Sequence, residues 1–179
     1  HEAGQFDHRA VELKGLNDLV SYVDKTAESR LVEGLSTILP EAGFITEEGT
    51  ASHNEEILRW VVDPLDGTTN FTHGLPVFSI SIALMQGDQV VLGVVYEINR
   101  QEMFEATRGQ GAKLNGQKIT ISNRQKLSES LLATGFPYWD FKEMAAYLKI
   151  LDEFMKNTHG LRRMGSAAVD LAYVACGRF

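Results

Sequence analysis

Two acidic residues, a glycine and two threonines lie close together in the segment Asp63-Pro64-Leu65-Asp66-Gly67-Thr68-Thr69-Asn70. The apolar run Trp60-Val61-Val62 leads into Asp63, which predicts a core strand that ends on an acid. Asp66 follows after two intervening residues, and Gly67 permits a tight turn or a close approach of the backbone. Two carboxylates on one turn suit Mg²⁺, which prefers oxygen ligands. Backbone amides after Gly67 could face an anion.

A surface turn is the simpler interpretation of the same pattern, because Asp, Pro and Gly dominate turns. For Asp-x-x-Asp-Gly alone, a solvated turn is the more frequent outcome. The context favours a site, since the strand before Asp63 is apolar and the doublet Glu47-Glu48 also follows a strand candidate, Phe44-Ile45-Thr46. Such a doublet is usually a solvated pair, but here it can supply a third carboxylate.

The segments that position this turn predict an antiparallel α+β first part. Apolar residues at helical spacing predict a helix over residues 24–39, and Pro40 and Gly43 end it. Asn115-Gly116 predicts a type I′ hairpin, and Gly87-Asp88 joins two further strands. The expected strands cover residues 44–46, 60–63, 77–86, 89–97, 102–107, 112–114 and 118–121.

The pattern changes after about Lys126. A strand over 130–135 and helices over 141–157 and 166–175 indicate the beginning of an α/β second part. We therefore predict a layered α/β sandwich in two units. Residues 1–126 would form an N-terminal α+β metal-binding domain, and residues 127–179 an incomplete C-terminal α/β domain.

The formal net charge of −7 does not favour general nucleic-acid binding. It also requires a positive group at any phosphate site, and a bound metal would supply one. Cys176 is the only cysteine, which excludes an intrachain disulfide and suits a reducing cytoplasm. No apolar run reaches the ~18–20 residues of a membrane span. Because the first residue is His1 rather than Met, we expect the natural start to lie upstream.

The motifs taken together resemble the inositol monophosphatase family. Residues 60–71 are similar to its central signature, and Val23-Asp24 and Glu47-Glu48-Gly49 are similar to its upstream acidic elements. Residues 93–96, 109–112 and 115–116 resemble its meander, and 160–168 the start of its second domain. The resemblance covers essentially the entire chain in the right order. It implies a sandwich of the inositol monophosphatase/fructose-bisphosphatase type.

The resemblance also implies Mg²⁺-dependent hydrolysis of a phosphate monoester, most simply inositol monophosphate, by direct attack of water. Its metal ligands would be three carboxylates and one backbone carbonyl: Glu47, Asp63, Asp66 and Leu65. Its catalytic residues would be Glu47, Thr68 and Asp24. Thr68 would help to orient the attacking water, with Asp24 as its partner. Mg²⁺ at such a site would lower the pKa of a bound water.

The implied substrate contacts are Gly67, Thr68, Lys14, Ser166 and Ala167. Amides of the first two would hold the phosphate. Lys14 would lie on a mobile active-site loop, although a solvated lysine is an equally good interpretation. Ser166 and Ala167 would lie near the substrate ring, or form a purely structural helix start. The expected substrate is a small phosphorylated polyol, and the family also implies a homodimer and sensitivity to lithium.

The family pattern continues beyond Phe179 with a Trp-Asp-x-Ala motif, whose aspartate binds a second metal. We therefore expect this chain to be a fragment, with that ligand and most of the ring-recognition surface outside it. Two alternatives stay open: a related sugar- or nucleotide-bisphosphate phosphatase, and a non-catalytic scaffold that acts through protein partners, with Arg162-Arg163 on its surface. A haloacid-dehalogenase mechanism is disfavoured, because its Asp-x-Asp spacing near the chain start is not that of Asp63 and Asp66. No P-loop motif is present.

Overall fold

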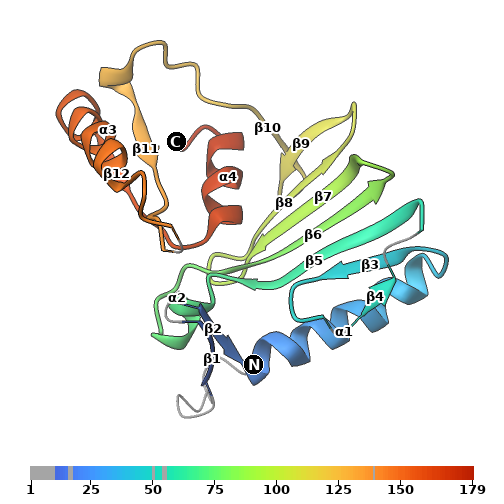
Figure 1. Ribbon diagram of the computed structural model, residues 1–179. Helices are drawn as coiled ribbons and strands as arrows, with labels where there is room; N and C mark the ends of the chain where they lie inside the picture. The colour runs from blue at the N-terminus through green and yellow to red at the C-terminus, as the bar shows by residue number, and fades with distance from the viewer. Residues whose placement is uncertain (1–10, 16–17, 50, 54–55, 139) are drawn as a thin grey trace.

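The computed structural model describes residues 11–15, 18–49, 51–53, 56–138 and 140–179 (Figure 1). Its centre is one eight-stranded sheet in the order β10-β9-β8-β7-β6-β5-β3-β4. The strands are β3 (Gly43–Thr46), β4 (Ser52–His53), β5 (Leu58–Asp66), β6 (Ser79–Gln86), β7 (Gln89–Glu97), β8 (Glu102–Thr107), β9 (Gly111–Leu114) and β10 (Gln117–Ile119).

Every neighbouring pair in this sheet is antiparallel except β3 and β5, which run parallel. The hairpin predicted at Gly87-Asp88 joins β6 to β7 and is confirmed. Asn115 and Gly116 have φ values of 47° and 79°, as a type I′ turn between β9 and β10 requires. The parallel pair was not predicted, because it depends on a crossover connection rather than on local turn chemistry.

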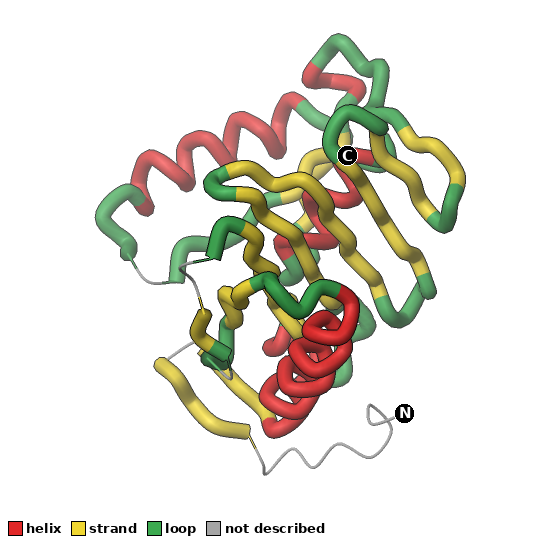
Figure 2. Tube along the Cα trace, turned by 90° about the vertical axis from the view of Figure 1, so that its right-hand side faces the viewer, coloured by secondary structure: helices red, strands yellow, loops and turns green. Residues whose placement is uncertain are grey.

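Helices cover the two faces of the sheet. The helix α1 (Tyr22–Ile38) packs on one face, where Val62 is 2% exposed, and α4 (Ala167–Ala175) packs on the other (Figures 1 and 2). On the second face the fully buried Val169 of α4 packs in one cluster with Phe104. Burying a side chain of this kind contributes about 1.5–3 kcal/mol. The sheet is therefore held from both sides, as the predicted layered sandwich requires.

The remaining elements lie at the edges of this sandwich. Their bounds are β1 (Val11–Gly15), β2 (Asp18–Ser21), α2 (Thr68–Thr72), η3 (Leu127–Glu129), β11 (Leu131–Ala133), α3 (Met144–Asn157) and β12 (Gly160–Arg162). β1 pairs with β2, and β11 pairs in parallel with β12, beside which α3 lies. None of the described helices has the length and apolar character to cross a bilayer. The domain boundary after residue 126 stays a prediction.

Several strand boundaries differ from the sequence-based expectation, and the end of β5 is the one that affects the site. The strand expected to end at Asp63 continues to Asp66, and its register with β6 shifts between these two residues. Pro64 lies within this irregularity, where its missing N–H costs no ladder hydrogen bond. The irregular stretch brings both acids to the end of β5, and α2 begins immediately after Gly67.

Candidate functional site

The first turn of α1 meets the start of α2. Asp24 is 2% exposed, and its Oδ1 lies 3.0 Å from Thr68 Oγ1. Thr68 Oγ1 also lies 3.0 Å from the carbonyl oxygen of Leu65. A hydroxyl carries one proton, so Thr68 donates to one of these acceptors at a time. The structure brings together the two residues that the family resemblance pairs, and their catalytic role stays a prediction.

The three candidate acids for metal binding form one cluster of like charge. Burial, the nearby charges of Glu47 and Asp66, and a hydrogen bond with Glu47 together raise the pKa of Asp63 to about 8, and burial is the largest of these causes. A carboxyl group with such a pKa is protonated in much of the population at neutral pH. An acid whose ionisation is opposed by two neighbouring acids indicates a place where a cation would be stabilising.

The Leu65 backbone completes the oxygen set. Asp63 Oδ1 accepts a hydrogen bond from the Leu65 N–H at 3.0 Å, which fixes the turn that follows Asp63. Carboxylates and a carbonyl are the ligands that Mg²⁺ prefers, so the residues present fit this ion. Among the described residues, no three His, Cys, Asp or Glu side chains lie together in a way that could hold a metal ion by themselves. The hydrogen bond between Glu47 and Asp63 nevertheless shows that these acids are neighbours.

Gly67 is required where it stands. Its φ of +99° is in the left-handed region, and a Cβ atom there would lie 3.0 Å from the Val77 carbonyl oxygen and 3.2 Å from that of Gly165. Because α2 begins at Thr68, the amides of Gly67 and Thr68 lie at a helix N-terminus, where helices leave N–H groups for other acceptors. This position is consistent with their predicted contact to phosphate, which stays a prediction.

Asp66 is held by the start of α4. Its Oδ2 accepts hydrogen bonds from Ser166 Oγ and from the Ala168 N–H, each at 2.6 Å. Ser166 is 1% exposed. The resemblance places Ser166 and Ala167 beside the substrate ring, and the structure places them beside Asp66. Contact of either residue with a substrate remains a prediction.

A cavity of about 680 Å³ opens next to this contact. It is lined by residues of α4 and of the segments around β11 and β12, among them Asp66, Tyr138, Arg163, Ser166, Ala167 and Asp170. Burial, together with the negative charge of Asp66, raises the pKa of Asp170 to about 6. The sequence interpretation missed Asp170, although its spacing of four residues from Ser166 places both on one side of α4.

Buried Glu28 is a second residue that the sequence interpretation missed. Its side chain is 0% exposed, and its Oε2 accepts a hydrogen bond of 2.7 Å from the Glu48 N–H. Glu28 lies one helical turn after Asp24, so one side of α1 reaches both the Glu47-Glu48 turn and Thr68. The signal was an acid on the apolar side of a predicted helix.

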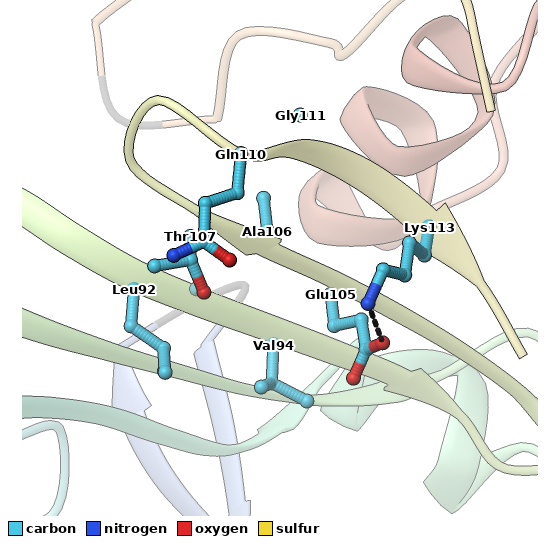
Figure 3. A pocket seen from close by; sticks show the side chains of 9 residues that line it. Leu92, Val94, Glu105, Ala106, Thr107, Gln110, Gly111 and Lys113 are labelled. Atoms are coloured by element: carbon cyan, nitrogen blue, oxygen red, sulfur yellow. Dashed lines mark ion pairs between the residues drawn. The ribbon is translucent and has the colours of Figure 1, made fainter. Parts of the chain in front are cut away.

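Lys14 cannot be placed in the site. Its backbone lies in β1, and its side chain is outside the described part of the chain. Another hollow, of about 140 Å³, lies over β7, β8 and β9 (Figure 3). Its lining contains the ion pair of Glu105 and Lys113 at 3.7 Å and none of the predicted site residues. The hollow beside Asp66 is therefore the candidate site.

Comparisons with known proteins agree with this geometry. Residues 2–179 match the model of the inositol monophosphatase family. The chain is 41% identical to the Nus factor SuhB of Pasteurella multocida, in an alignment that covers 96% of this chain and 65% of that protein. It is 42% identical to the inositol-1-monophosphatase of Mesorhizobium japonicum, covering 98% of this chain and 66% of that protein.

A solved structure gives the same result for the fold. The extragenic suppressor protein SuhB of Bartonella henselae superposes with a TM-score of 0.89 at 43% identity, over 94% of this chain and 66% of that one. The sandwich of α1, the mixed sheet and α4 is thus the fold of these proteins. The chain spans about two thirds of the length of each.

Proposed function

Because this chain belongs to the inositol monophosphatase family, we propose that it is a Mg²⁺-dependent phosphatase that hydrolyses a phosphate monoester by direct attack of water. The observation that carries the proposal is the cluster of Glu47, Asp63 and Asp66, in which the pKa of Asp63 rises to about 8. A cation bound there would remove this repulsion. It would also attract an anionic ester to a chain whose net charge is −7.

Glu47, Asp63, Asp66 and the Leu65 carbonyl would hold the ion. When bound, Mg²⁺ lowers the pKa of a coordinated water and offsets charge on the phosphate. Thr68 Oγ1 orients the attacking water by accepting one of its protons. As Thr68 takes that proton, it passes its own to Asp24 Oδ1, 3.0 Å away. Buried Asp24 would thus end with the proton, and the water, having lost it, would attack phosphorus as hydroxide.

The cavity beside Asp66 supports a small substrate. Its volume of about 680 Å³ lies within the usual range of ligand pockets, roughly 300–1,000 Å³. The amides of Gly67 and Thr68 would hold the phosphate, and the alcohol would lie toward Ser166 and Ala167. We propose a phosphorylated polyol, inositol monophosphate first, with sugar and nucleotide bisphosphates as the alternatives.

A scaffold without catalysis is the second candidate. It is favoured by the name of one relative, the Nus factor SuhB of Pasteurella multocida. Arg162 and Arg163 are exposed and could belong to a partner surface. The two candidates differ in what they require of Asp66, because a scaffold has no need of a metal ligand.

The experiment is phosphate release by the complete protein from inositol monophosphate, fructose bisphosphate and adenosine bisphosphate, with Mg²⁺ and with a chelator. We expect Mg²⁺-dependent release that Asp66→Asn lowers by at least about 100-fold. Asp88→Asn is the matched control, because Asp88 is fully exposed. Release from none of the three esters would refute the proposal and favour the scaffold.

A further inference from the structure

Asp66 offers a cation only part of its carboxylate. Its Oδ2 already accepts two hydrogen bonds of 2.6 Å, from Ser166 Oγ and the Ala168 N–H. Bonds of this length to an ionised acceptor are among the strong ones. Occupied in this way, Oδ2 has little capacity for a metal ion, and Oδ1 is the atom left to bind it.

Ser166 has its own hydrogen-bond partners, and they set the direction of its hydroxyl. Its Oγ accepts from the Val169 N–H at 3.3 Å, as the N-cap of α4, and lies 3.3 Å from Ser79 Oγ. Since the single Ser166 proton goes to Asp66, Ser79 must be the donor to Ser166. The chain of hydrogen bonds therefore runs from Ser79 through Ser166 to Asp66.

Burial makes this arrangement costly to replace. Ser79 is 0% exposed and Ser166 is 1% exposed. Water therefore has little access to take the place of a missing hydroxyl, so loss of the hydroxyl leaves Asp66 Oδ2 held by the Ala168 N–H without its second bond. A helix cap needs only an acceptor at the Ser166 side chain. The hydrogen bond that Ser166 Oγ donates to Asp66 is not needed for capping the helix.

We propose that Ser166 is a positioning residue for magnesium binding, because it fixes Asp66 Oδ2 and thereby directs Oδ1 toward the ion. The inference rests on the proposed function, in which Asp66 is a metal ligand. It adds that the start of α4, about a hundred residues further along the chain, determines how well β5 presents that ligand. Ala168 contributes a second donor through its backbone, which no side-chain substitution removes.

Three variants separate this role from helix capping. Ser166→Gly removes the hydroxyl but leaves an N-cap that costs only a few tenths of a kcal/mol relative to Ser. Ser166→Ala removes hydroxyl and cap together. Ser166→Thr retains both. Ser79→Ala is the control, because it removes a neighbouring buried hydroxyl and leaves the contact between Ser166 and Asp66 intact.

The measurement is Mg²⁺ affinity by titration calorimetry on the complete protein, with thermal unfolding in a chelator as the readout for structural damage. Removal of a group that orients a metal ligand typically costs about 10–100-fold in affinity. We expect this weakening in Ser166→Gly and Ser166→Ala, recovery in Ser166→Thr, and less than about a threefold change in Ser79→Ala.

Unchanged Mg²⁺ affinity in Ser166→Gly would overturn the proposal. A loss of Mg²⁺ affinity that is proportional to the loss of thermal stability across the variants would overturn it as well. Mg²⁺ binding by the parent protein without hydrolysis of any ester refutes the proposed function alone, since the calorimetric comparison still tests Ser166. Absence of Mg²⁺ binding by the parent protein overturns both.

Discussion

Substitution of Asp63 by Asn tests the like-charge cluster in the metal-free protein. The pKa of Asp63 in the folded state is about 8, against an ordinary value of 3.8. The folded protein therefore binds more protons than the unfolded chain between these values. It follows that the stabilising contribution of protonated Asp63 is complete below pH ~4 and is lost as the pH rises through about 8.

The size of the effect follows from the same values. The interval from 3.8 to about 8 corresponds to ~6 kcal/mol at ~1.4 kcal/mol per pH unit. Asp63 and Asp66 are only partly buried, so solvent screens their charges and reduces the cost to roughly 2–4 kcal/mol. Asn cannot ionise, and it retains the oxygen that accepts the Leu65 N–H. Asp63→Asn should therefore be more stable than the parent protein at pH 8 and similar to it at pH 4.

Thermal unfolding in a chelator, from pH 4 to pH 9, measures this difference. For a chain of this size, 2–4 kcal/mol raises Tm by roughly 4–16 °C. Asp88→Asn is the control for loss of one negative charge, because its side chain is fully exposed. If Asp63→Asn and the parent protein have the same Tm at pH 8, the reasoning about the cluster is wrong.

Thr68→Val should lower kcat by about 100-fold or more, with Mg²⁺ affinity changed less than about threefold, because it removes the hydroxyl that orients water; retained activity in Thr68→Val would contradict this, and Thr68→Ser is the control. Glu28→Ala should cost ~1–3 kcal/mol, because the Glu48 N–H loses its acceptor; denaturant unfolding measures the loss, and Glu28→Gln should recover much of it. Glu102→Gln should lower Tm at neutral pH. Hydrogen bonding to Arg178 lowers the pKa of Glu102 below its usual 4.5, so the ion pair stabilises the fold above pH 4.5. The difference in Tm between Glu102→Gln and the parent protein should vanish as the pH falls through the lowered pKa. A difference that persists at pH 2–3 would count against the ion pair as its cause.

The parts of the site that depend on neighbouring residues could be predicted from the sequence. The acid-rich turn after Val62 is visible because its residue types specify a strand end and a tight turn. Asn115-Gly116 specified its hairpin for the same reason. The contact between Asp24 and Thr68 came from the family resemblance, since nothing local to either residue indicates the other.

The parts that depend on packing could not be predicted. The donation from Ser166 to Asp66 joins residues 100 positions apart. It exists because α4 packs across the sheet, where Arg178, just beyond the end of the helix, is bound to Glu102. Burial of Glu28 likewise depends on where α1 packs. A local pattern of residue types does not indicate which distant segment will pack against it, so it predicts neither of these contacts.

The separation between Asp66 and Ser166 has a consequence for the order in which the site forms. Asp24, Glu28, Glu48 and Thr68 are all present once residue 68 has been synthesised. The donors to Asp66 Oδ2 do not exist until residue 168 has been added. Domains emerge from the ribosome N-terminus first, at about 5–20 residues per second. Asp66 is therefore synthesised ~5–20 s before the Ser166 and Ala168 donors that hold it. In that interval the nascent chain contains the like charges of the cluster without the contact that orients Asp66, and tight metal binding becomes possible only afterwards.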